Sequence, residues 1–145
     1  MFGTNWTKMA SLCSRVEARW VSTCFGSFGQ NASVLAYRNP RKTAKTCAIA
    51  APYGGEAACI RYAAEDIAGT YSNGRQASVL CDITSASLRG GCFEAIGSLL
   101  RYLKTTVATR RSACEATTAV PRYVADCMHG MTKRTSIPGL NRSAR

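Results

Sequence analysis

The 145-residue chain is poor in acidic residues and in histidine, and it has no long apolar run. Eight Asp and Glu stand against nineteen Lys and Arg, and His129 is the only histidine. No stretch is long and apolar enough to span a bilayer, and the N-terminus lacks the apolar segment of a secretory signal. A lone histidine without a partner motif gives no support to a nucleophilic triad, so we predict no enzyme activity and no catalytic residue.

The cysteine spacing argues against the common metal and cofactor sites. Structural zinc takes ligands from Cys-x2-4-Cys knuckles, iron–sulfur clusters from closely spaced runs, and redox or copper carriers use adjacent cysteines or Cys-x-x-Cys. Every cysteine pair in this chain is wider than that. The glycine pairs at Gly54 and Gly90 lack the flanking pattern of a phosphate-binding loop. We therefore predict neither a metal ion nor a cofactor.

What the chain does have is a regular series of eight cysteines in four pairs. The pairs are Cys13/Cys24, Cys47/Cys59, Cys81/Cys92 and Cys114/Cys127, and the first members of successive pairs are 34, 34 and 33 positions apart. An even number of cysteines in a small protein is typical of a disulfide framework formed in an oxidising compartment. All eight are predicted to form disulfides.

The spacing within the pairs favours helices. At about 100° per residue, eleven positions bring the second cysteine back to within about 20° of the first, on the same stripe of a helix. The apolar periodicity predicts helices over residues 6–25, 43–68, 77–107 and 111–128. The wider second and fourth pairs contain Pro52, Gly54, Gly55 and Pro121, which predict a kink or a distorted turn between the cysteines.

The two halves of the chain superpose without a gap, which indicates an internal duplication. One constant shift places Cys13 on Cys81, Cys24 on Cys92 and Cys59 on Cys127, with Cys47 one residue from Cys114. The predicted fold class is all-α, with two tandem disulfide-stapled helical hairpins and an extended C-terminal tail. The predicted parts are a first hairpin unit (1–69), a linker (70–76), a second hairpin unit (77–131) and a basic tail (132–145).

Two antiparallel helices with two cysteines each suggest a definite pairing. The first cysteine of a unit then meets the last, and the second meets the third. The predicted bonds are Cys13–Cys59, Cys24–Cys47, Cys81–Cys127 and Cys92–Cys114. The alanines of residues 48–58 would let the helix axes approach closely enough for such bonds.

Paired helices with widely spaced cysteines resemble the coiled-coil-helix–coiled-coil-helix family, whose usual motif is a twin Cys-x9-Cys. The resemblance covers residues 13–127, although the spacings here are ten to twelve residues. It implies a non-catalytic accessory subunit of a mitochondrial respiratory-chain complex, most of all NADH:ubiquinone oxidoreductase (complex I). Such a subunit would lie on the intermembrane-space face of the inner membrane, as a peripheral protein, and would aid assembly and stability.

Other compartments stay open at this point. Lys8, Arg15 and Arg19 could form a weak matrix-targeting signal, although Glu17 and the structural use of Cys13 argue against it. Three sequons, at Asn5, Asn31 and Asn141, keep secretion as a further alternative.

Positive charge is the second informative feature. No acid occurs between Arg19 and Lys45 or in residues 132–145. Such clusters attract acidic protein surfaces, anionic lipids such as cardiolipin, or RNA phosphates. The predicted partners are neighbouring subunits of a large mitochondrial membrane complex, with cardiolipin as a further contact. The alternative function is a mitochondrial ribosomal protein that contacts rRNA. The predicted partner-binding residues are Arg38, Arg41, Lys42, Lys45, Arg110, Arg111, Lys133 and Arg134.

Overall fold

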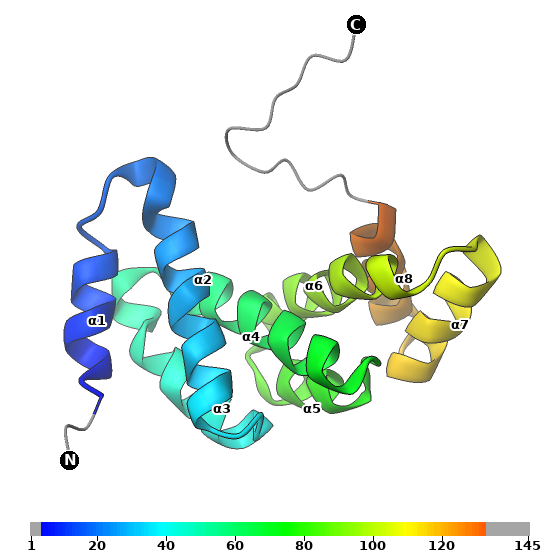
Figure 1. The fold of residues 1–145 in the computed structure, drawn as a ribbon, viewed down its shortest axis with the longest axis horizontal. Coiled ribbons are helices and arrows are strands. Elements are labelled where there is room, and N and C mark those ends of the chain that lie inside the picture. Colours follow the sequence, from blue (N-terminus) through cyan, green and yellow to red (C-terminus); the bar gives the residue numbers. More distant parts are fainter. Residues whose placement is uncertain (1–3, 133–145) are drawn as a thin grey trace, which may run out of the picture.

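The computed structural model describes residues 4–132, and every regular element in that range is helical (Figure 1). Short and long helices alternate along the chain. The short ones are α1 (Trp6–Cys13), α3 (Pro40–Ile49), α5 (Arg75–Ile83) and α7 (Val107–Thr117). The longer ones are α2 (Ala18–Leu35), α4 (Glu56–Tyr71), α6 (Ala86–Leu103) and α8 (Pro121–Thr132), and a 3-10 turn, η1 (Ala51–Tyr53), precedes α4.

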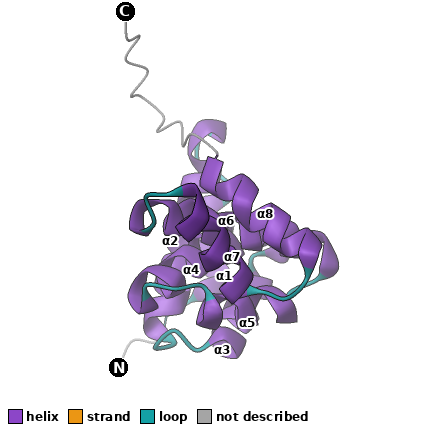
Figure 2. Ribbon diagram, turned by 90° about the vertical axis from the view of Figure 1, so that its right-hand side faces the viewer, coloured by secondary structure: helices purple, strands orange, loops and turns teal. Residues whose placement is uncertain are grey.

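The helices form a stack of helical pairs in two layers. The long helices pack in sequence, α2 on α4, α4 on α6 and α6 on α8, and the short helices follow the same order beside them. Figure 1 shows the pairs in order from α1–α2 at one end to α7–α8 at the other, and Figure 2 looks along this stack. Each pair contacts chiefly its neighbours, which is the architecture of a helical repeat. The regular interval between first cysteines is thus the period of the fold.

Each cysteine pair is one disulfide, so the predicted pairing is wrong. The bonds are Cys13–Cys24, Cys47–Cys59, Cys81–Cys92 and Cys114–Cys127, with Cα–Cα distances of 5.4 to 5.7 Å. The predicted bonds Cys13–Cys59, Cys24–Cys47, Cys81–Cys127 and Cys92–Cys114 do not occur. All eight cysteines are nevertheless bonded, as expected.

The physical reason is that the chain reverses direction between the two cysteines of every pair. In one continuous helix, cysteines eleven positions apart would lie about 16 Å apart, far beyond the reach of a disulfide. The reversal brings the end of each short helix against the start of the next long one. The two cysteines of a pair therefore lie on two different helices and not on one stripe of a single helix.

The turns inside the pairs confirm two expectations and correct two others. The predicted break at Pro52–Gly55 is the 3-10 turn followed by Gly54, whose φ of 76° ends it, and Pro121 is the first residue of α8. The helices predicted over 6–25 and 77–107 are both interrupted, because the chain turns before Ala18 and again at Thr84 and Ser85. No proline or glycine marks either of these turns.

The fold class is confirmed as all-α, with helical hairpins stapled by disulfides. The first predicted unit, 1–69, corresponds to two stapled pairs, α1–α4, and the second, 77–131, corresponds to the pairs α5–α8, with helix ends that extend past the predicted bounds. Within the segment 70–76, α4 continues to Tyr71 and α5 begins at Arg75. Both halves contribute to one hydrophobic core. The predicted tail lies, apart from Thr132, outside the described residues.

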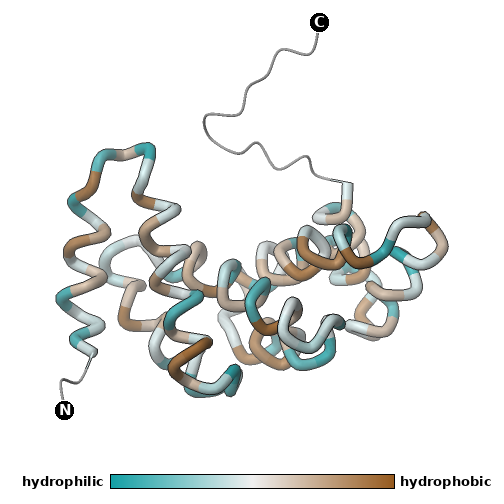
Figure 3. Tube along the Cα trace, in the orientation of Figure 1, coloured by the Kyte–Doolittle hydropathy of each residue, from teal (hydrophilic) through white to brown (hydrophobic). Residues whose placement is uncertain are grey.

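The core is built from small side chains and a few large ones. Of the 25 buried hydrophobic residues in the described range, many are alanine or cysteine, and the large fully buried side chains include Phe25, Phe28, Phe93 and Leu100. Trp6 packs edge-on against Phe28 with ring centroids 4.9 Å apart. Figure 3 shows polar and apolar residues interspersed along each helix, as expected for helices with one buried face. Small side chains allow the axes to approach closely but bury little area each.

Two glycines mark where the long helices cross most closely. A Cβ at Gly29 of α2 would overlap the carbonyl oxygen of Cys59 on α4, and a Cβ at Gly97 of α6 would overlap the carbonyl oxygen of Cys127 on α8. The shift that places Cys24 on Cys92 also places Gly29 on Gly97, so the internal duplication is visible in the packing. No side chain larger than hydrogen fits at either crossing.

A tryptic map of the non-reduced protein distinguishes the two disulfide patterns. We expect peptide 46–61 alone, with its own internal bridge, because Cys47 and Cys59 both lie in it. The other bonds should join three peptide pairs, 9–15 with 20–38, 76–89 with 90–101, and 112–122 with 123–133. Mass spectrometry before and after reduction measures this. A cluster that joins peptides 9–15, 20–38 and 46–61 would support the bonds Cys13–Cys59 and Cys24–Cys47 instead.

Substitution of Gly29 or Gly97 by alanine should destabilise the fold. The new methyl group has a backbone carbonyl in its way, and such overpacking typically costs about 1–3 kcal/mol in the free energy of unfolding. Urea denaturation monitored by circular dichroism measures the loss. Gly69→Ala is the matched control, because the nearest atom to its Cβ is the flexible Leu99 side chain at 3.1 Å. That variant should be neutral or slightly stabilising, since alanine favours helix.

Candidate anion-docking surface

Among the described residues, three exposed cations lie close together in sequence on α3. Asn39 caps this helix by accepting a hydrogen bond from the Lys42 amide at 3.0 Å, and Pro40 is its first residue. Arg41, Lys42 and Lys45 follow within the first two turns and are exposed. None of the three makes an ion pair within the described chain. The Cys47–Cys59 disulfide fixes the end of α3, so these charges stand on a rigid support.

Arg38 differs from its neighbours, because its side chain turns into the protein. Its Nε donates to Oδ2 of Asp66 on α4 at 3.2 Å, and the Ser33 hydroxyl donates to the same oxygen at 2.8 Å. The backbone of Tyr37 and Arg38 is left-handed, with φ of 52° and 58°, which turns the chain from α2 into α3. Arg38 therefore stabilises this turn, and its charge is neutralised within the chain.

A groove of about 520 Å³ borders the cations of α3. Arg41, Ala44, Lys45 and Ala48 form its α3 side. The start of α4 and the turn between α5 and α6 close it, through Glu56, Ile83, Thr84 and Ser85. The groove thus combines apolar contacts from alanine and isoleucine with two cations on its α3 side and one carboxylate, Glu56, at the start of α4. This combination suits a partner that presents both an apolar side chain and an anionic group.

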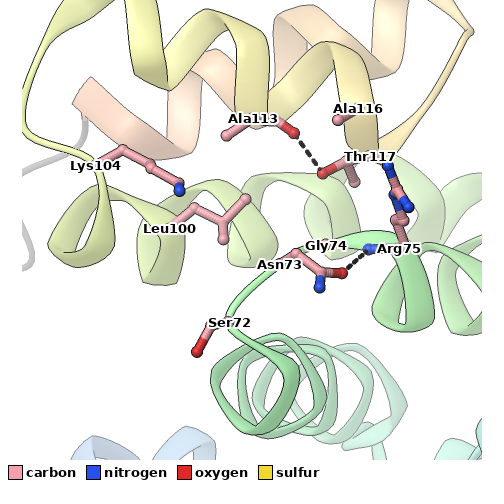
Figure 4. A pocket seen from close by; sticks show the side chains of 9 residues that line it. All are labelled: Ser72, Asn73, Gly74, Arg75, Leu100, Lys104, Ala113, Ala116 and Thr117. Atoms are coloured by element: carbon pink, nitrogen blue, oxygen red, sulfur yellow. Dashed lines mark hydrogen bonds between the residues drawn. The ribbon is translucent and has the colours of Figure 1, made fainter.

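A second groove, of about 350 Å³, lies one repeat further along (Figure 4). The turn before α5, the end of α6 and the helix α7 line it with Ser72, Asn73, Gly74, Arg75, Leu100, Lys104, Ala113, Ala116 and Thr117. In Figure 4 the Lys104 side chain extends from α6 beside Leu100, and the Arg75 side chain lies next to Thr117. Neither cation has an ion pair in the described part of the chain.

The two grooves share residues at equivalent positions of the repeat. Arg41 and Arg75 both lie six residues before the first cysteine of their pair, and Thr84 and Thr117 both lie three residues after it. Each groove has one such arginine and one such threonine. The sequence reasoning missed Arg75 and Lys104, because it searched for clusters of charge rather than for one charge per repeat. The step from Arg41 to Arg75 equals the step between first cysteines, and this was the signal that could have found Arg75.

The other predicted partner-binding residues are distributed differently. Arg110 is half-buried and donates from Nε to the Lys104 carbonyl at 2.9 Å, so it holds the turn between α6 and α7. Arg111 is exposed and lies 3.8 Å from Glu115, one turn along α7. Lys133 and Arg134 lie outside the described residues. Arg41, Lys42 and Lys45 therefore lie together on α3, and Arg75 and Lys104 line the next groove, all without ion pairs in the described chain. Lys8 and Arg15 of the first pair line a further groove.

Carboxylates collect on the long helices instead. Glu94 of α6 lies between Arg61 of α4, at 3.4 Å, and His129 of α8, at 3.1 Å. These three residues occupy the same position of successive repeats, two residues after the second cysteine.

Glu65, one turn after Arg61, is partly buried. Burial raises the pKa of its carboxyl above the ordinary value of 4.5, and the nearby Arg61 guanidinium lowers it by less.

Within residues 4–132 there is no group of three or more His, Cys, Asp and Glu side chains placed to hold a metal ion. In the same range, no helix combines the length and the apolar character that crossing a membrane requires.

Replacement of Arg38 by alanine should lower the free energy of unfolding by about 1–3 kcal/mol, because the mostly buried Asp66 carboxylate loses a charged donor. Chemical denaturation at neutral pH measures the change. Lys42→Ala is the control, since Lys42 is exposed, and we expect it to stay within about 0.5 kcal/mol of the parent protein. Equal effects of the two substitutions would contradict the structural role of Arg38.

Glu65 should make the protein less stable as the pH rises. Its folded pKa is higher than its unfolded pKa, so the folded state binds more protons between these two values, and stability falls as the pH rises through that window. Glu65→Gln removes this effect. The variant should therefore gain stability over the parent at pH 7 and much less at pH 4, in parallel denaturation curves. The exposed Glu115→Gln serves as the control, and a gain that is the same at both pH values would speak against this assignment.

Comparison with known proteins adds no relative to this picture. The chain matches no protein-family model, no curated protein and no solved structure.

Proposed function

We propose that the protein is a non-catalytic helical scaffold that docks onto an anionic surface of a larger assembly. One observation carries the proposal: Arg41, Lys42 and Lys45 are exposed, lack ion pairs in the described chain, and stand on a disulfide-fixed helix beside a groove. Flexible surface lysines and arginines lose side-chain and backbone freedom when they bind. A rigid support reduces that entropic cost.

The specific form of the proposal is an accessory subunit of a mitochondrial respiratory-chain complex, most of all complex I, on the intermembrane-space face. Support comes from the helical hairpins held by pairs of widely spaced cysteines, which fit a twin-cysteine hairpin type, and from a disulfide framework that needs an oxidising compartment. The bonds here join the two cysteines of each pair, whereas the family that the chain resembles bridges the first cysteine to the fourth and the second to the third. The scaffold role depends on the cations, and the place in complex I depends on the resemblance alone.

For a subunit of complex I, the proposed lipid contact is cardiolipin, an anionic lipid of the inner membrane. The competing function is a mitochondrial ribosomal protein, in which the same cations would bind rRNA phosphates. Native-gel fractionation of mitochondria separates the two. Comigration with NADH dehydrogenase activity supports the complex I subunit. Comigration with rRNA, lost after treatment with nuclease or high salt, would support the ribosomal protein instead. Comigration with neither would refute both.

The cations themselves are tested with a variant in which Arg41, Lys42 and Lys45 become glutamine. Binding to cardiolipin-containing vesicles or to RNA should weaken, and the dependence of log K on log salt for RNA should become shallower by about two. The control variant neutralises Lys8, Arg15 and Arg19, which removes the same charge from the end of the molecule. If both variants lose binding equally, net charge rather than this surface determines docking.

A further inference from the structure

The groove between the third and fourth pairs contains a half-buried cation without a counter-ion. Lys104 directly follows α6, is only partly exposed and makes no ion pair within residues 4–132. In Figure 4 its side chain lies beside Leu100, which also lines the groove. Among the described residues that line this groove there is no Asp or Glu. A cation that has lost part of its hydration and has no partner attracts an anion.

A second cation lines the same groove from a different helix. Arg75, the first residue of α5, is exposed and also lacks an ion pair in the described chain. In the view of Figure 4, Arg75 and Lys104 lie on opposite sides of the groove, with Leu100 and Thr117 between them. A ligand that contacts both cations must therefore extend across the groove.

Aliphatic side chains line part of this groove and restrict the kind of anion that fits. They belong to Leu100, Ala113 and Ala116, and no described residue along the groove is aromatic. Proteins hold the bases of single-stranded nucleic acids chiefly by stacking on aromatic side chains, which this groove does not offer. A bilayer presents its anionic groups on a broad surface, whereas these cations flank a groove between two helical pairs. The lining thus favours an extended ligand with carboxylates beside aliphatic groups, which is the chemistry of an acidic protein segment.

The groove one repeat earlier has the same kind of lining. Ile83 occupies there the position that Ala116 has in the later groove, two residues after the first cysteine of its pair. Arg41 and Lys45 supply the cations, and Glu56 is the one carboxylate among the described lining residues. No aromatic side chain is among them either. Since α3, α5 and α7 follow one another along the stack, the two grooves lie at successive steps of the repeat (Figure 1).

We propose that an extended acidic segment of a partner protein binds along these two grooves, with its carboxylates at the cations and its aliphatic side chains on the apolar lining. Neighbouring helices pack about 8–10 Å apart and an extended chain advances about 3.3 Å per residue, so one repeat corresponds to about three residues. The segment therefore carries an acidic residue at about every third position. The proposal rests on the docking function proposed above and names its partner as a protein segment.

Fluorescence anisotropy with the full oxidised chain and a labelled peptide of four Leu-Glu-Ser repeats tests this. The parent protein should bind this peptide more tightly than a peptide of the same composition with all its glutamates at one end. Arg75→Gln combined with Lys104→Gln should raise the dissociation constant about tenfold or more, because two charge-assisted contacts are lost. Lys8→Gln combined with Arg15→Gln is the matched control, which removes the same charge at the other end of the stack. That variant should change the dissociation constant by about twofold or less, since distant charges are screened at physiological salt.

A substitution that leaves both cations in place gives a second readout. Ala116 is exposed on α7, so the fold should tolerate Ala116→Glu, and the new carboxylate should repel the peptide from the groove. Ala125→Glu is the matched control, because Ala125 is exposed on α8 and lines neither groove. Only the first of these two variants should lose affinity for the peptide. Circular dichroism establishes that each variant is folded.

Three outcomes would each overturn the proposal: equal binding of the two peptides, equal losses in the groove and control variants, or tighter binding of an oligouridine of similar length than of the peptide. If the α3 substitutions abolish vesicle or RNA binding and the peptide does not bind, the docking function stands and the acidic segment is refuted. Peptide binding that depends on Arg75 and Lys104, together with vesicle and RNA binding that the α3 substitutions leave unchanged, would support the segment and refute docking through α3.

Discussion

The disulfide between each short helix and the following long helix is the constraint on which this fold depends. Helices of 8 to 11 residues are marginal by themselves, so α1, α3, α5 and α7 need a fixed partner. A bond that closes a loop of about a dozen residues removes about 3 kcal/mol of unfolded-state entropy in the chain-entropy account. The alanine-rich core adds less per residue than a core of leucine and phenylalanine would. The four bonds therefore compensate for a core whose small side chains permit close packing.

Close packing in turn explains how the duplication survives in the structure. Where α2 crosses α4, Gly26 lies against the Tyr62 ring, and where α6 crosses α8, Gly130 lies against the backbone carbonyl of Glu94. When the two halves are superposed, Glu94 falls on Gly26 and Gly130 falls on Tyr62, so the glycine of this contact lies on the first helix in one half and on the second helix in the other. The space between the helices needs one small residue at this point, on either side. Sequence similarity between the halves can thus fade while the crossing geometry persists.

The sequence determines the helical class and the repeat, but it leaves the pairing of helices ambiguous. Eight cysteines in regularly spaced pairs predict stapled helices correctly, and Pro52 and Pro121 predict two of the turns between them. The turns before Ala18 and at Thr84 escape detection because neither proline nor glycine marks them. A helical pattern that continues across these turns then favours bonds from the first cysteine to the fourth and from the second to the third. Among the candidate site residues, exposure of Arg41, Lys42 and Lys45 follows from local polarity. The inward turn of Arg38 depends on Asp66, 28 positions away, and local patterns do not contain that information.

The division of charge between the two layers has the same physical origin. The inner long helices α4 and α6 pack against long helices on both sides, so a charged side chain on them must find a partner or lose hydration, as Glu94 does between Arg61 and His129. Short helices pack less extensively on one another, and their cations can stay hydrated without a partner, as on α3. An excess of Lys and Arg over acids then appears as positive charge on the short-helix layer. Binding of an anionic partner there needs no rearrangement of the buried ion pairs, so the stability of the stack and its docking can vary independently.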